Sequence, residues 1–554
     1  MASIIKKIKN GNPYYYAVVS ARVNGEPRIV SQKYLGSVDK IISNAENAKP
    51  PEPNEAVVYE YGGVTALWEI IDQLGIIDII NKHSPKRNQG TTVGHYMTLA
   101  AINRALKPQS KTKIADWYKQ TSLQKIWKIP PKTFTSQRFW DHMDCLTEDK
   151  LMDIEQDITR CIIEHYDIDL NCLLYDSTNF FTWIDSFNES SELAQRGKNK
   201  QGRNNLRQVS LALLISRDSQ VPLFHEVYPG NRNDFSQFQN ITSKLSSLCK
   251  DLKKHCPDIT FVFDKGNNSQ NAMDTLHMGK MHFVGSLTPS HYKELLDINI
   301  DKFEPLNSDK SPGLRAYRTS AEVFGQKRTV VITYSERFFC TQHATISREL
   351  NKAINALVSL STKLSGWKEG AKKGRKPVKQ TVNKQVADIL SAQYMKRIIK
   401  TEVFEKDGYI SLKFNTDHRE MQSIVDKILG KSILFTDQKN WSTEDIVNSY
   451  HGLAKIEDKF KDMKNIEFLH WQPMFHWTDQ KIRVHAFYCV LAMTIVSLLR
   501  LTLERAGMKI SVSEMLKQLQ SIYEVAVIYP DKKPKMTLSR MNSMQKRILE
   551  IVNE

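Results

Sequence analysis

Three residues, Tyr450, Glu457 and Lys464, follow one another at intervals of seven within the charged segment YHGLAKIEDKFKDMK. Seven residues turn an α-helix through about 700°, so residues at this spacing lie nearly in line along one edge. A carboxylate on such a line can bind a cation, and a lysine can form a charge-assisted contact to phosphate. The segment therefore predicts a helix that holds one carboxylate between a tyrosine and a lysine.

Two aspartates stand at the ends of apolar runs that are typical of buried strands: Asp176 ends IDLNCLLYD, and Asp264 ends DITFVFD. If these strands are neighbours, both carboxylates emerge at one sheet edge, and a helix packed across the sheet could bring Glu457 to them. Clustered carboxylates repel one another, and Mg²⁺ and Mn²⁺ prefer oxygen ligands. The three acids are thus candidate ligands for two such ions, which can catalyse phosphoryl transfer.

Each acid also has a purely structural interpretation. Asp176 precedes Ser177, Thr178 and Asn179, which favour a turn. Asp264 precedes Lys265-Gly266, another turn signal, and a glutamate on a charged helix is usually solvated. On the predicted helix of Glu457, Gly452 either lowers the stability of the helix or allows DNA backbone to approach closely.

The elements that must position these residues follow from the sequence pattern. From residue 168 to 287 the order is three strands, helix, strand, helix, strand, with a turn at 217–219 and the first helix at 233–255. Residues 13–35 predict a β-hairpin turning at Asn24-Gly25, and residues 62–160 are helical in pattern, with an N-cap at Thr135 or Ser136. This helical region could dock on DNA or be an ordinary helical domain.

A long segment interrupts the sheet before the helix of Glu457. It contains a strand pair at 315–324 and 327–336, a helix at about 341–366, a Lys-rich loop and a strand at 409–415. Another strand follows at 431–437, and Ser442 is the expected N-cap of the next helix. We expect these domains: 1–60, 61–165, a core of 166–295 with 431–505, an insertion of 296–430, and a helical tail of 506–554.

Composition narrows the functional class. The chain has 554 residues and a net charge of +17, which favours a polyanionic partner such as nucleic acid, although a basic protein without one has the same balance. Seven scattered cysteines without a CxxC pair indicate a reducing compartment. The N-terminus has no apolar run of signal-peptide length, and the apolar stretch 486–501 predicts a buried helix.

Taken together, the chain resembles the DDE-class transposases of bacterial and archaeal insertion sequences, in the branch with a large insertion before the catalytic glutamate helix. LLYDSTNFF and TFVFDKGNNS resemble the two aspartate motifs, and RGKNKQGRNNLRQVSLALL, YPGNRND and HWTDQKIRVHAF add similarity as far as about residue 505. The third motif of the family runs Tyr, two residues, Arg, three residues, Glu, six residues, Lys. Tyr450, Glu457 and Lys464 occupy its positions, whereas Leu453 replaces the arginine, for which Lys455 or His451 could substitute.

The resemblance implies an α/β fold with an RNase H-like mixed-sheet core, the first aspartate on its first strand and the second after its fourth. It implies that Asp176, Asp264 and Glu457 are catalytic and bind two Mg²⁺ or Mn²⁺ ions. The enzyme would act as an endonuclease on the terminal inverted repeats of its insertion sequence and join the ends to target DNA. We therefore expect double-stranded DNA as partner, a homodimer on DNA, and a cytoplasmic, nucleoid-associated location in a prokaryote.

Further residues are candidates for DNA contact. Tyr450 and Lys464 would touch the backbone near the cut, as the resemblance implies. Arg483 could reach DNA or simply pair with Asp479. Basic side chains after the first aspartate could track phosphates: Arg196, Lys198, Lys200, Arg203 and Arg207. The basic loop 368–379 could do the same or be solvated, Trp367 could stack on a flipped base, and His225 is expected to be structural. The alternative functions are a catalytically silent DNA-binding protein and an RNase H-like nuclease.

Overall fold

A computed structural model describes residues 2–23, 25–47, 52–85, 90–185, 187–197, 199, 202–232, 258–306, 313–369, 376–530 and 533–554. The chain divides into two compact units. The first comprises Met1–Tyr59 and Tyr523–Arg540, and the second comprises Glu60–Ile522 and Met541–Glu554. Each is described by itself.

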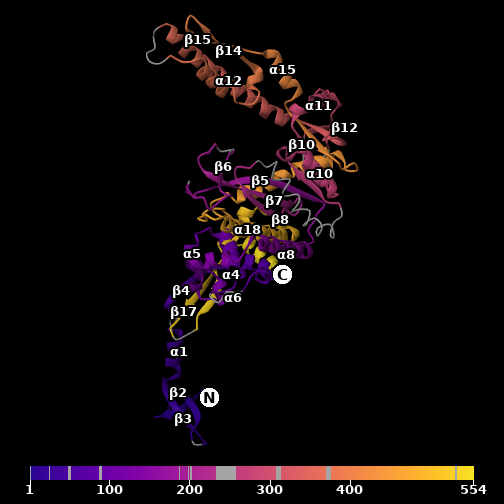
Figure 1. The fold of residues 1–554 in the computed structure, drawn as a ribbon. Helices are drawn as coiled ribbons and strands as arrows, with labels where there is room; N and C mark the ends of the chain where they lie inside the picture. The colour runs from indigo at the N-terminus through magenta and orange to yellow at the C-terminus, as the bar shows by residue number, and fades with distance from the viewer. Residues whose placement is uncertain are drawn as a thin grey trace. The chain divides into compact units, whose positions relative to one another are not determined.

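The first unit is built mainly from strands (Figure 1). The predicted hairpin is confirmed as β2 and β3, and Gly25 adopts a φ of +83° at the turn. A further strand, β1, pairs with β2 and was not expected from the sequence. A second sheet has the order β18-β17-β4. The elements are β1 Ala2–Lys9, β2 Asn12–Val23, β3 Glu26–Gly36, α1 Val38–Glu46, β4 Glu55–Glu60, β17 Tyr523–Ile528 and β18 Lys535–Leu538.

The second unit begins with the helical region that the sequence predicts. Thr135 is confirmed as an N-cap, because its hydroxyl accepts a hydrogen bond from the backbone N–H of Arg138 at 3.3 Å. The helices are α2 Gly62–Gln73, α3 Ile76–His83, α4 Val93–Leu106, α5 Lys111–Lys119, α6 Leu123–Trp127, α7 Ser136–Met143 and α8 Glu148–Tyr166.

A large mixed sheet follows, so the fold is mixed α/β. Within the described residues it has ten strands in the order β11-β12-β13-β16-β10-β9-β5-β7-β6, with β8 paired to β7. The strand β5 pairs antiparallel with β7 and parallel with β9, and β9 pairs parallel with β10. The strands are β5 Cys172–Thr182, β6 Gln195–Arg196, β7 Arg207–Ser216, β8 Pro222–Pro229, β9 Thr260–Phe263, β10 His282–Leu287, β11 Glu304–Pro305, β12 Leu314–Val323, β13 Gln326–Ser335 and β16 Lys431–Thr436.

The predicted meander is confirmed as β5, β7 and β8, with a turn at residues 217–219. Every residue of β7 after Arg207 is buried, which explains its continuous apolar run. The helix α10, Gln270–Met278, follows β9 as expected, whereas the helix predicted at 233–255 lies outside the described residues.

The predicted strand pair is confirmed as β12 and β13, and these strands continue the large sheet through β16. The helix α12 then starts a segment with a separate hydrophobic core, which includes Leu357, Met395 and Ile424. The predicted strand at 409–415 is β15, and its partner β14 was not expected. The elements are α12 Glu336–Lys368, α13 Lys379–Ile389, α14 Met395–Ile398, β14 Ile399–Lys406, β15 Tyr409–Thr416 and α15 His418–Lys427.

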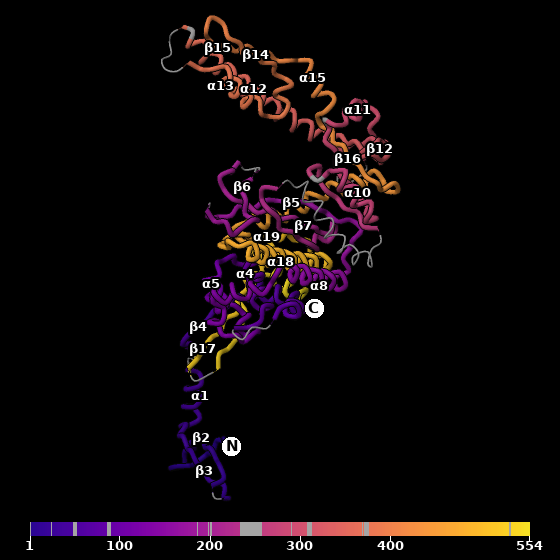
Figure 2. The backbone as a smooth tube through the Cα atoms, in the orientation of Figure 1, coloured from indigo at the N-terminus to yellow at the C-terminus, as the bar shows by residue number. Residues whose placement is uncertain are grey.

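The C-terminal part of the second unit contains α16 Thr443–His451, α17 Leu453–Asp462, α18 Asp479–Arg505, α19 Val512–Gln520 and α20 Ser543–Asn553. By length and composition α18 could cross a membrane, but 89% of its most apolar window is buried inside the structure. It contacts β8 of the sheet as well as α4 and α2. Figure 2 shows α18 next to α4. The predicted buried helix at 486–501 is therefore confirmed as part of α18.

Candidate active site

The two aspartates come together because their strands are neighbours. The parallel pairing of β5 with β9 matches Cys172 with Thr260 and Tyr175 with Phe263. One residue further along both strands, Asp176 and Asp264 stand at the same level, and side chains at one level of adjacent strands point to the same face. Both side chains are half-buried. The sheet thus presents a pair of carboxylates at the end of β9.

The hydroxyl of Tyr450 contacts this pair directly. It donates to Oδ1 of Asp264 at 2.8 Å and lies 2.8 Å from Oγ of Ser286 on β10. Burial raises the pKa of Tyr450, and the negative charges of Asp264 and, further away, Asp176 raise it more. The hydroxyl therefore remains protonated at neutral pH and acts as a hydrogen-bond donor to the carboxylate.

Lys464 lies just after α17 and contacts β5, the strand that carries Asp176. Its Nζ donates to Oγ1 of Thr178 at 2.7 Å and lies 5.3 Å from the ring centroid of Phe180. Thr178 is two residues beyond Asp176 and so shares its face of the sheet. The prediction of one continuous helix from Tyr450 to Lys464 is wrong, because α16 ends at His451, α17 covers Leu453–Asp462, and Lys464 follows in a turn. Tyr450 and Lys464 still contact neighbouring strands, Tyr450 at Asp264 after β9 and Lys464 at Thr178 on β5.

The helix pair α16–α17 is positioned by local sequence. Ser442 and Asp445 form a reciprocal capping box at its start, as expected. Ile456, Phe460 and Met463 form a buried stripe, and α17 packs on β5 while α16 packs on β9 and β10. The apolar stripe therefore fixes the helices across the sheet.

Gly452, at the junction of the two helices, allows the close contact with β5. A Cβ at this position would lie 2.8 Å from the backbone oxygen of Ser449 and 3.3 Å from both Cδ2 of Leu174 and Cγ of Arg217. The space beside Gly452 is filled by the protein, so the alternative that it admits DNA backbone is wrong.

Glu457 lies exposed on α17, whereas the two aspartates are half-buried. Among the described residues, no three His, Cys, Asp or Glu side chains gather closely enough to hold a metal ion. The aspartate pair alone fits Mg²⁺, which commonly takes one or two carboxylates and completes its shell with water and substrate phosphate. The role of Glu457 as a third ligand stays a prediction.

Two polar residues at this site were missed in the sequence. Ser286 donates to Oδ1 of Asp264 at 3.2 Å, and its backbone oxygen accepts a hydrogen bond from Nδ2 of Asn268 at 2.6 Å. The side-chain oxygen of Asn268 is buried and has no hydrogen-bond partner within the described part of the chain. Neither residue belongs to a spacing pattern, because only the pairing of β9 with β10 brings Ser286 beside Asp264.

Leu453, which replaces the arginine of the motif, packs against the protein core and is half-buried. Lys455 donates from Nζ to the backbone oxygen of Arg217 at 2.8 Å, and Nη1 of Arg217 donates to Oγ of Ser449 at 2.9 Å. Arg217, on the turn after β7, therefore ties the sheet to the α16–α17 junction.

The basic residues after β5 differ in their surroundings. Arg196 and Arg203 are exposed, and the guanidinium of Arg203 lies 5.9 Å from the ring centroid of Phe181. Arg207 donates to the backbone oxygen of Asn188 at 2.8 Å, which holds the loop before β6. Lys198 and Lys200 lie outside the described residues.

Arg483 forms contacts within the protein. Its Nε lies 3.1 Å from Oε2 of Glu148, and Nη1 donates to the backbone oxygen of Val227 at 2.8 Å. The expected alternative pairing with Asp479 is wrong. Asp479 instead accepts hydrogen bonds from the hydroxyl of Ser191 and from the backbone N–H groups of Glu192 and Leu193.

In the inserted segment, Trp367 is partly buried near the end of α12. Residues 370–375 of the predicted basic loop lie outside the described residues, and Lys376 beyond them sits 4.1 Å from the ring centroid of Tyr409.

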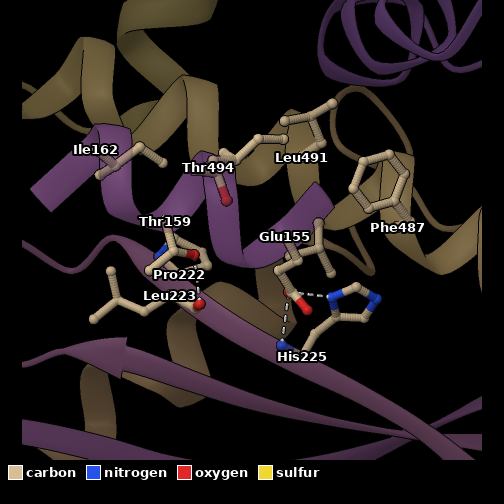
Figure 3. A pocket seen from close by; sticks show the side chains of 11 residues that line it. Glu155, Thr159, Ile162, Pro222, Leu223, His225, Phe487, Leu491 and Thr494 are labelled. Atoms are coloured by element: carbon tan, nitrogen blue, oxygen red, sulfur yellow. Dashed lines mark hydrogen bonds and ion pairs between the residues drawn. The ribbon is translucent and has the colours of Figure 1, made fainter. Parts of the chain in front are cut away.

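His225 is structural, as expected. Its Nδ1 lies 2.5 Å from Oε1 of Glu155, and the same oxygen accepts the backbone N–H of His225 at 2.9 Å (Figure 3). Burial lowers the pKa of His225, but the carboxylates of Glu155 and Glu226 raise it, and the net shift is upward. The adjoining cavity, between α8, β8 and α18, measures about 20 Å³, enough for about one water molecule.

Comparison with known proteins gives distant structural neighbours. No protein-family model and no curated protein matches the sequence. The chain is similar to the piggyBac transposase synaptic complex with hairpin DNA over 84% of its length and 82% of that chain, with 9% identity and a TM-score of 0.34. It is similar to the Mos1 transposase paired-end complex with the left transposon end over 36% of its length and 60% of that chain, which is less than two thirds, with 13% identity and a TM-score of 0.14. Both TM-scores are below 0.5, so neither likeness identifies a function for this chain.

Proposed function

We propose that the protein is a DDE-class transposase that cleaves the ends of an insertion sequence and joins them to target DNA. The observation that carries this proposal is the joining of two distant motifs. Tyr450 of the Tyr-Glu-Lys line bonds to Asp264, and Lys464 of the same line bonds to Thr178, two residues from Asp176. A solvated charged helix and two unrelated turns would not converge in this way.

The sheet supports an RNase H-like core. Asp176 lies on β5, the first strand of the large sheet, and Asp264 directly follows β9, the fourth strand when the two-residue β6 is left out. This is the placement of the two aspartates that the family resemblance implies. The segment with its own core, between β13 and β16, stands where the resemblance implies an insertion before the glutamate helix.

Each side chain has a distinct role in the proposed reaction. Asp176 and Asp264, with Glu457 brought to them on α17, would hold two Mg²⁺ or Mn²⁺ ions. Such ions, when bound, polarise an attacking oxygen and stabilise a leaving oxygen at the scissile phosphate. Tyr450 orients Asp264 through its hydroxyl, and Ser286 supports the same carboxylate oxygen. Lys464, bonded to Thr178 on the strand of Asp176, would supply a positive charge for the phosphate next to the cut.

The partners follow from this reaction. The substrate is double-stranded DNA carrying terminal inverted repeats, and a homodimer would hold two ends together. The net charge of +17 fits a polyanionic partner, and the exposed Arg196 and Arg203 lie on the chain shortly after β5. We place this activity in the cytoplasm of a prokaryote, at the nucleoid, where its DNA substrate lies.

The test uses purified protein and DNA fragments that end in the inverted repeats flanking its gene. Wild-type protein is expected to cleave these ends with Mg²⁺ or Mn²⁺, to be inactive in a chelator, and to join cleaved ends to a plasmid. Metal-independent binding without cleavage would instead support a silent DNA-binding protein. Cleavage of RNA–DNA hybrids in preference to the repeats would support an RNase H-like nuclease.

A further inference from the structure

Four aromatic side chains stand out by their exposure. Among the large hydrophobic side chains that the structure describes as exposed, the most exposed aromatic ones are Phe187 at 92%, Phe475 at 71%, Trp183 at 67% and Trp477 at 59%. The next, Tyr34, is 51% exposed. Exposed rings of this kind are costly to leave in water, and their gathering on two segments needs a reason.

The four rings come from two segments that are held side by side. Trp183 and Phe187 lie just after β5, and Phe475 and Trp477 lie between α17 and α18. Gln472 donates from Nε2 to the backbone oxygen of Phe181 at 2.8 Å, which joins the segments at one end. At the other end, the carboxylate of Asp479 accepts the backbone N–H groups of Glu192 at 3.0 Å and Leu193 at 3.1 Å.

The paired segments continue directly from the active site. Trp183 is seven residues beyond Asp176, so at about 3.3 Å per strand residue it lies within about 23 Å of it. Lys464, which contacts Thr178, begins the second segment. The exposed guanidinium of Arg203 lies 5.9 Å from the ring centroid of Phe181, two residues before Trp183 on the chain. The exposed rings thus lie on segments that lead directly from the proposed point of cleavage.

We propose that Trp183, Phe187, Phe475 and Trp477 form a stacking surface for unpaired bases of a DNA strand that leads from the active site. This inference rests on the proposed function, since it names a part of the substrate of the same site. Every base has a flat face that can stack on an aromatic ring, and cations beside the rings follow the phosphates. Paired bases inside a duplex do not expose these faces, so the surface selects unpaired nucleotides rather than duplex.

The experiment measures DNA binding in a chelator, where no metal-dependent cleavage occurs. The probes are a fluorescent duplex with an unpaired oligothymidylate tail and a blunt duplex of the same paired length. The double variant Phe475→Ala/Trp477→Ala is expected to weaken binding of the tailed probe by roughly 5- to 150-fold for each stacked base that is lost. Binding of the blunt probe should change by less than about twofold.

Two controls make the result specific. Phe338→Ala removes a ring that is 42% exposed from α12, which belongs to neither of the two segments, and should leave both affinities unchanged. Trp477→Tyr keeps a stacking ring and should retain most of the preference for the tail. Equal losses on both probes, or no loss on the tailed probe, would overturn the inference. So would a change in oligomeric state by light scattering without a change in DNA affinity, which would assign the rings to a second copy of the chain.

This result is separable from the proposed function. If Asp176→Asn abolishes cleavage while the double variant binds the tail like wild type, only the stacking surface is wrong. If Asp176→Asn cleaves like wild type, the proposed function fails, whatever the binding assay shows.

Discussion

The hydrogen bond between Tyr450 and Asp264 joins the helix α16 to one of the two candidate carboxylates. Since the hydroxyl donates to the carboxylate, Tyr450 can hold Asp264 in place, whereas its predicted contact with DNA stays a prediction. A sequence can place a tyrosine on a helix edge, but it cannot give the partner, because that depends on how α16 crosses β9 and β10. The role of Tyr450 is therefore that of a positioning residue.

Removing this hydroxyl should impair the site without dismantling the helix. Tyr450→Phe keeps the buried ring but leaves Asp264 without its donor, so we expect cleavage to fall about 10- to 100-fold. The Mn²⁺ concentration for half-maximal cleavage should rise, which a purely structural defect would not cause. The control is Tyr409→Phe in β15, and unchanged metal dependence of Tyr450→Phe would contradict the positioning role.

At the scale of elements, the α16–α17 junction depends on the absence of a side chain at Gly452. Gly452→Ala would press a methyl group against Leu174 and Arg217, at a cost of about 1–3 kcal/mol of unfolding free energy. Cleavage should fall as well, because α17 would be displaced from β5. Chemical denaturation measures the cost, with Lys461→Ala on the exposed face of α17 as the control. An increase in stability, as ordinary helix propensity predicts for Gly→Ala, would contradict the close packing.

The helix α17 contains a buried lysine, Lys459, whose burial lowers the stability of the fold. Lys459 is 3% exposed, and its Nζ donates to Oγ of Ser497 on α18 at 2.9 Å. Burial, aided by the charge of Arg500, lowers its pKa to about 8 from an ordinary value of 10.5. The unfolded chain therefore holds the proton more tightly, and stability rises with pH between about 8 and 10.5.

Lys459→Met should remove this penalty. Below about pH 8 the full shift acts, so we expect a gain of up to about 3 kcal/mol, less the lost contact to Ser497. The rise of stability between pH 8 and 10.5 should flatten, as followed by denaturation at several pH values. A variant that is less stable than wild type at pH 7, with the same pH dependence, would contradict a buried, strained charge.

The sequence predicts helices and strands well where their signal lies in neighbouring residues. The alternation of β2 and β3 about Asn24-Gly25, the run of β7 and the cap at Ser442 all depend on neighbouring residues, and all are confirmed. What the pattern could not give depends on distant pairing. The strand β14 and the joining of β12–β13 to the large sheet through β16 are decided by partners far along the chain.

At the scale of the whole molecule, the positive charge should make DNA binding depend steeply on salt. The logarithm of the affinity is expected to fall linearly with the logarithm of the salt concentration. Lys464→Gln should weaken binding for all sequences and reduce this slope by about 1, because one phosphate contact is lost. Lys461→Gln, which changes charge equally at an exposed site paired with Asp458, serves as the control. Identical slopes for both variants would argue against a phosphate contact at Lys464.

The candidate site itself could be predicted only in part. Asp176 and Asp264 were found because each ends an apolar run, and the register of β5 with β9 brings them to one level. Ser286 and Asn268 were not found, since no spacing links them to either aspartate. Glu457 was found by its spacing, but its position relative to the aspartates depends on the fine placement of α17.

If Asp176 and Asp264 together hold the catalytic cations, Asp264→Asn should show it most directly, through Mn²⁺-dependent cleavage of the inverted-repeat ends. This substitution keeps the shape and a hydrogen-bond acceptor for Tyr450 but removes the charge. We predict that cleavage is lost while end binding in a chelator is retained, and that Asp388→Asn, at an exposed carboxylate on α13, cleaves like wild type. Cleavage by Asp264→Asn at the wild-type rate would contradict the account.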